Sequence, residues 1–180
     1  HSPSVVAVTK IGGGDGTVVS NTVSGRRINC GPVCSNGFPS GSTLSLSAAA
    51  AANAKFMGWR GGCSGSAGCS LAVGGADVAV SAEFKACYSL TVAAEPAAGG
   101  TVRVAGAPDC GARYISGKAV TLQAAPKPGW YFKGWVNASG PADSGRTVMN
   151  ADKTVKALFG RCFRLQPKVN PSGAGRVFVK

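Results

Sequence analysis

The stretch Phe56-Met57-Gly58-Trp59 returns 76 residues later as Phe132-Lys133-Gly134-Trp135. A second stretch repeats with the same offset, because residues 40–48 (SGSTLSLSA) match residues 116–124 (SGKAVTLQA). A fixed offset in two separate blocks indicates an internal repeat, in which each copy forms one structural unit.

The repeat continues after these blocks. Residues 77–84 (DVAVSAEF) match residues 152–159 (DKTVKALF) at an offset of 75, and the Cys-containing segment 84–90 returns at 159–165. The second match lies after the end of the second copy, so it begins a third. We therefore expect two modules and the first hairpin of a third, at residues 1–86, 87–161 and 162–180.

Apolar and polar residues alternate within each block. Leu44 and Leu46 alternate with Ser and Thr, and Val120 and Leu122 do the same in the second copy. A period of two is typical of strands with one buried face, and Gly and Pro clusters separate the runs as hairpin turns would. The pattern predicts an all-β, mainly antiparallel fold.

The composition of one Ala-rich segment, residues 47–54, suggests a helix, because alanine favours helices. The equivalent stretch of the second copy contains Pro126 and Pro128, and proline breaks helices. We therefore expect a loop at this place in both copies.

Seven cysteines in a Gly- and Ser-rich chain indicate disulfides formed in an oxidising compartment. The alternative is a zinc site, which usually has Cys-x-x-Cys pairs or histidines. The spacings here are wider, and His1 is the sole histidine. No metal or cofactor is therefore expected.

Loop length and the repeat suggest the pairing. Cys30 can reach Cys34, Cys63 can reach Cys69, and neither pair has a counterpart in the second copy. A hairpin over residues 88–104 would place Cys87 beside Cys110. Cys162 repeats Cys87 but has no partner before the chain ends, so we expect it to be unpaired.

These residues resemble the divergent internalin-B-like bacterial repeat. The similarity lies in residues 28–35 (INCGPVCS), in the Gly-Trp segments at residues 56–63 and 128–135, and in residues 149–159 (MNADKTVKALF). The resemblance implies a small β-rich fold in tandem copies within secreted or cell-surface bacterial proteins, where the rest of a larger multidomain protein would be its partner. It implies no reaction.

The chain offers little for catalysis. Its only histidine is at the terminus, and its acidic residues are scattered, with Asp77 and Asp152 at the same repeat position, where a structural turn role is the simpler account. We expect a non-catalytic protein that serves as a spacer, display or adhesion segment.

The net charge of +12 allows the alternative of binding an anionic cell-surface polymer or a glycan, although no dense basic block indicates specific nucleic-acid binding. The candidate contacts are Trp130 and Tyr131, which only the second copy has, and the nearby Lys127 and Lys133. Trp59 and Trp135 recur beside a recurrent Phe, so we expect them in the core.

Two further expectations concern membrane spanning and the hairpin over residues 162–180. No stretch is apolar and long enough for a transmembrane segment. The 162–180 hairpin has no module to join, so its edge is expected to seek a partner strand, with a dimer as one outcome.

Overall fold

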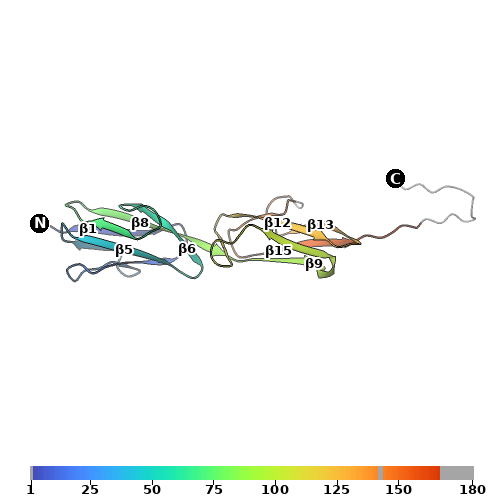
Figure 1. The fold of residues 1–180 in the computed structure, drawn as a ribbon, viewed down its shortest axis with the longest axis horizontal. Helices are drawn as coiled ribbons and strands as arrows, with labels where there is room; N and C mark the ends of the chain where they lie inside the picture. Colours follow the sequence, from blue (N-terminus) through green and yellow to red (C-terminus); the bar gives the residue numbers. More distant parts are fainter. Residues whose placement is uncertain (1, 142–143, 167–180) are drawn as a thin grey trace, which may run out of the picture.

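The computed structural model describes residues 2–141 and 144–166, and it is built almost entirely from strands in two modules that lie end to end (Figure 1). The first module contains β1 (Ser4–Ile11), β2 (Gly16–Ser20), β3 (Asn29–Cys30), β4 (Ser35–Phe38), β5 (Thr43–Ala50), β6 (Ala54–Gly61), β7 (Cys69–Ala72) and β8 (Val78–Tyr88). The second contains β9 (Leu90–Glu95), β10 (Gly100–Ala105), β11 (Tyr114–Ile115), β12 (Ala119–Pro126), β13 (Trp130–Val136), β14 (Arg146–Val148) and β15 (Lys153–Arg161). The all-β fold is confirmed.

Each module is a sandwich of two sheets. In module 1 the strand orders are β4-β1-β8-β6 and β3-β2-β5-β7, and in module 2 they are β13-β15-β9 and β10-β12-β14. Most pairs are antiparallel, but the first strand of each module pairs in parallel with the last, β1 with β8 and β9 with β15. The described part of the chain has one helix, the three-residue turn Ala97–Gly99, which is too short to cross a membrane.

The inward faces of the two sheets form a separate core in each module. Leu44 and Leu46 are buried in the first, and Val120 and Leu122 are buried in the second, as the alternation predicts. The last strands repeat this pattern, because Val80, Ala82 and Phe84 are buried like Val155, Ala157 and Phe159.

The Phe-x-Gly-Trp motif builds the same aromatic cluster twice. The Phe56 ring lies 5.1 Å from Trp59 and 5.3 Å from Phe84, and the Phe132 ring lies 5.3 Å from Trp135 and 6.0 Å from Phe159. Trp59 and Trp135 are both buried, which agrees with the core role expected for them.

The glycine of this motif sits at a β-bulge. The register shifts between Phe56 and Gly58 and again between Phe132 and Gly134, where the glycine φ values are +139° and +144°. A Cβ at Gly58 would also lie 2.8 Å from the carbonyl oxygen of Gly65. Only glycine fits such a position without strain, and the bulge turns the following Trp into the core.

Two local predictions were wrong. Residues 47–50 are not a loop but the end of β5, where Ala48 and Ala50 pair with Val18 and Gly16, so the turn is confined to residues 51–53. The alanine side chains are small enough for β5 to continue beside β2 as far as Ala50.

Residues 88–104 do not form a hairpin ladder either. β9 pairs with β15 and β10 pairs with β12, so the two consecutive strands belong to opposite sheets. Pairing with the distant β15 places the apolar face of β9 against the module 2 core, whereas a local two-stranded ladder would have no facing sheet to pack on.

Candidate functional site at the module junction

The two modules share a strand. From Val78 to Glu83, β8 pairs with β1 of module 1, while Cys87 and Tyr88 pair with Ile115 and Tyr114 of module 2. The strand therefore crosses the boundary expected between residues 86 and 87. Ser89 alone separates it from β9, so no flexible linker lies between the modules.

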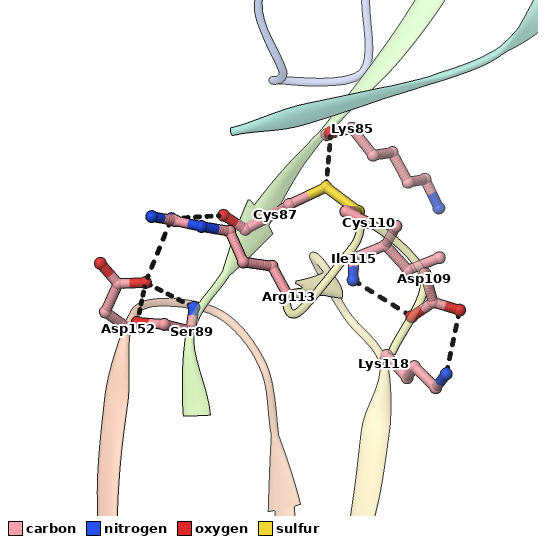
Figure 2. The surroundings of a disulfide bond; sticks show 9 residues. All are labelled: Lys85, Cys87, Ser89, Asp109, Cys110, Arg113, Ile115, Lys118 and Asp152. Atoms are coloured by element: carbon pink, nitrogen blue, oxygen red, sulfur yellow. Dashed lines mark hydrogen bonds and ion pairs between the residues drawn. A yellow bond between two sulfur atoms is a disulfide. The ribbon is translucent and has the colours of Figure 1, made fainter. Parts of the chain in front are cut away.

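The crossing point is fixed by a disulfide, which Figure 2 shows, and by backbone hydrogen bonds. Cys87 is bonded to Cys110, with Cα atoms 6.4 Å apart, and the Cys87 side chain is buried. The Cys87 N–H donates to the carbonyl of Asn53 in module 1 at 2.7 Å, and the Ser116 N–H of module 2 donates to Ala86 at 2.8 Å. Each module thus holds the shared strand directly.

Asp109 organises the loop next to Cys110. Its carboxylate accepts hydrogen bonds from the Ile115 N–H at 3.3 Å and from Lys118 Nζ at 2.9 Å. Partial burial raises the pKa of this carboxyl, but the hydrogen bonds from Lys118 and Ile115 outweigh it, so the net pKa lies below the usual 3.8. The ionised Asp109 carboxylate therefore connects β11 to Lys118, the residue that precedes β12.

Asp152 fastens the start of β9 to the turn before β15. Its Oδ1 accepts from the Ser89 N–H at 2.6 Å and from the Ser89 hydroxyl at 2.9 Å, and it lies 4.0 Å from Arg113 Nη1 (Figure 2). The Ser89 N–H is the largest cause that lowers the pKa of Asp152. Arg113 Nη1 in turn donates to the Cys87 carbonyl at 3.5 Å, which links this clamp to the disulfide.

Module 1 has the same clamp without the arginine. Asp77, at the equivalent position, accepts from the Val5 N–H at 2.7 Å. Both carboxylates thus tie the first strand of a module to the turn before its last strand, which agrees with the structural turn role expected for them.

The other cysteines lie away from the junction. Cys30 is bonded to Cys34 and Cys63 to Cys69, which are the pairs suggested by the sequence, and each bond closes a short loop of module 1. The thiol of Cys162 is exposed and forms no disulfide with any cysteine of the chain. Residues 167–180 lie outside the described residues, and with them most of the third-module hairpin expected over 162–180.

The four candidate ligand contacts do not form one platform. Trp130 is half-buried against the module 2 core, with its ring 5.1 Å from the guanidinium carbon of Arg161. Tyr131 is 48% exposed, and it points to the opposite face because neighbouring strand residues alternate. Lys133 follows the exposed face of Tyr131, while Lys127 precedes β13 in an exposed turn.

The sequence analysis did not predict that one strand is shared by both modules, or that the carboxylate clamp of Asp152 lies beside this shared strand. The signal for the strand was present, since residues 78–88 alternate without a Gly or Pro interruption across the expected boundary. The role of Arg113 had no such signal, because it depends on a turn at Cys110–Arg113 that only the fold reveals.

Comparison with known proteins agrees with the repeat. The family model described as "Divergent InlB B-repeat domain" matches the chain twice, over residues 4–87 and 90–162. A comparison with curated proteins found no match.

Proposed function

Because the chain belongs to the divergent InlB B-repeat family, a family of bacterial surface modules, we propose that it is a non-catalytic spacer that holds neighbouring parts of a secreted or cell-surface protein at a fixed distance. The observation that carries this proposal is the shared strand β8, which joins the modules without a linker. A strand held by both modules resists bending far more than a Gly- or Ser-rich connection does.

The junction supports this role by its chemistry. The disulfide, the Asn53 and Ala86 carbonyls and the Asp152 clamp all act within a few residues of Ser89, where a hinge would otherwise form. Disulfides persist in extracytoplasmic compartments, which is where a surface spacer works. The polar groups at this site bond to one another and to the backbone of the crossing strand, which supports a role in holding its geometry.

The test is a distance distribution between the outer ends of the modules. Ser40 and Lys127 are exposed residues remote from the junction, since Ser40 closely follows Phe38, which pairs with Ser4, and Lys127 follows Pro126, which pairs with Gly100. Spin labels at Ser40→Cys and Lys127→Cys in a Cys162→Ser background therefore report the stiffness of the junction. We expect a single narrow distance in pulsed electron spin resonance.

The matched control inserts Gly-Gly-Ser between Ala86 and Cys87, inside β8, which separates the residues paired with module 1 from those paired with module 2 and leaves both cores intact. This variant is expected to show a broad distribution. A distribution that is already broad in the uninterrupted chain would refute the spacer proposal.

A further inference from the structure

Module 2 lacks a segment that closes one side of module 1. Ser20 and Val104 hold equivalent places, since they pair with Leu46 and Leu122 of the repeat. Seventeen residues (21–37) separate Ser20 from Phe38, but only nine (105–113) separate Val104 from Tyr114. Residues 21–37 contain β3 and most of β4, which in module 1 pair with β2 and β1, whereas module 2 keeps only the two-residue β11 in place of β4.

Three apolar side chains of module 2 are less buried than their counterparts in module 1, where this segment is present. In module 1, Val6 and Val18 are 0% exposed and Val8 is 4% exposed, in the same core cluster as Ile28 and Cys30 of residues 21–37. Their counterparts in module 2, namely Leu90, Val102 and Val92, are only partly buried against the core. The side of module 2 formed by β9 and β10 is therefore an apolar seam.

The backbone beside this seam is also open. The Lys153 N–H donates to the Ser89 carbonyl, so the odd-numbered residues of β9 bond to β15 and the even-numbered ones face away from it. In module 1 the residue equivalent to Val92 is Val8, whose N–H donates to Cys34 at 2.8 Å. Among the described residues, β11 reaches only Cys87 and Tyr88, and β9 ends its sheet.

We propose that this edge of β9 pairs with β9 of a second copy of the chain. An antiparallel ladder with its two-fold axis at Val92 sets Val92 opposite Val92 and Leu90 opposite Ala94. All three even-numbered residues then exchange hydrogen bonds with the partner copy. The small Ala94 leaves room for Leu90, and the valines bury one another over the seam.

The charges at the two ends of the ladder are complementary. Glu95 is the last residue of β9. Arg113 lies at the opposite end of β9, near Ser89. Antiparallel pairing brings Glu95 of one copy to Arg113 of the other, at both ends of the ladder. Lys156, 2.7 Å from Glu95, and Asp152, 4.0 Å from Arg113, complete a set of alternating charges without a like-charge pair directly opposed.

Sedimentation equilibrium of the Cys162→Ser chain is the first test, since this background removes crosslinking through the exposed thiol. We expect the average mass to rise from one chain towards two as the concentration approaches about 1 mM, as for a small interface. Ala94→Pro removes an N–H that faces the open edge and leaves the β15 bonds in place. It is expected to weaken dimerisation by about tenfold or more, because each dimer loses two hydrogen bonds.

Cysteine crosslinking tests the register separately, and does not depend on Ala94→Pro folding. Residues at a two-fold position of a hydrogen-bonded pair have Cα atoms about 5.5 Å apart, within disulfide range. Val92→Cys should therefore crosslink two chains quickly under mild oxidation. The matched variant Thr91→Cys should not, because its partner position is Ala93 of the other copy.

A chain that stays monomeric at every concentration overturns the proposal, and so does equal crosslinking of the two variants. Dimers that Ala94→Pro leaves unchanged would do the same. These outcomes are independent of the stiffness of the junction, so the spacer proposal can fail while this one holds.

Discussion

Thr147 shows how one residue of a repeat can be less well accommodated than its counterpart. Its side chain is 0% exposed, and its hydroxyl has no hydrogen-bond partner among the described residues. It pairs with Val120, while the same place in module 1 holds Leu71 opposite Leu44. A buried hydroxyl without a partner costs free energy that an apolar side chain avoids.

We predict that Thr147→Val stabilises the protein by about 1 kcal/mol, because the shape is kept and the unpaired hydroxyl is removed. The measurement is the free energy of unfolding in denaturant. Thr121→Val, at an exposed position on the neighbouring strand, serves as the control and should change little. A loss of stability in Thr147→Val would mean that the hydroxyl is bonded after all.

The Asp152 clamp makes stability depend on acid. Since hydrogen bonding with Ser89 lowers the folded pKa of Asp152 below 3.8, the carboxylate stabilises the fold above that pH, and this contribution is lost as the pH falls through the folded pKa. Asp152→Asn should therefore be less stable at neutral pH and lose less on acidification.

Denaturant midpoints between about pH 6 and pH 2 would measure this effect. Ser89→Ala keeps the backbone donor, which is the larger cause of the shift, so it should retain most of the acid dependence. An unchanged acid profile in Asp152→Asn would contradict the assignment.

At the residue scale the sequence was informative where a pattern recurred. The buried Trp59 and Trp135 followed from their repeated place beside Phe. Trp130 and Tyr131 could have been separated in the same way, because neighbours in a strand point to opposite faces. Their grouping as one contact surface ignored that rule.

At the scale of elements, the disulfides differ in what they constrain. Cys87–Cys110 spans 23 positions of the chain and holds the junction, while Cys30–Cys34 spans four positions within module 1. Loop-closure entropy alone assigns about 3 kcal/mol to the former and about 2 kcal/mol to the latter.

We therefore predict that the Cys87→Ser, Cys110→Ser double variant loses more stability than the Cys30→Ser, Cys34→Ser variant. Cys87 and Cys30 are similarly buried, at 2% and 1% exposed, so the cost of burying a serine is matched. Thermal unfolding of both variants gives the comparison. An equal or reversed order would show that the Cys87–Cys110 bond adds little to the hydrogen bonds around it.

Strand existence could be predicted from alternation, but strand partners could not. The pairing of β9 with β15 joins residues more than sixty positions apart, and no local pattern encodes it. The hairpin expected over residues 88–104 therefore failed, although Cys87 and Cys110 were paired correctly. They meet because β11 returns to the end of β8, not because of a hairpin.

At the scale of the whole molecule, the net charge of +12 determines how strongly the protein is attracted to anionic polymers. We predict retention on a heparin column that falls steeply with salt, because spread charge acts through counterion release. Trp130→Ala should not shift the elution, since Trp130 packs on the core, whereas Lys133→Ala should shift it slightly. A large shift with Trp130→Ala would favour a true carbohydrate or polyanion site.

The parallel pairing of first and last strands has a mechanical consequence. When the two ends of a module are pulled apart, β1 and β8, or β9 and β15, are drawn in opposite directions along their shared ladder. The load is then shear spread over all rungs at once, whereas an antiparallel pair pulled at one end would unzip rung by rung. Since β8 passes directly into module 2, tension applied to this chain travels from one ladder to the next through a continuous strand.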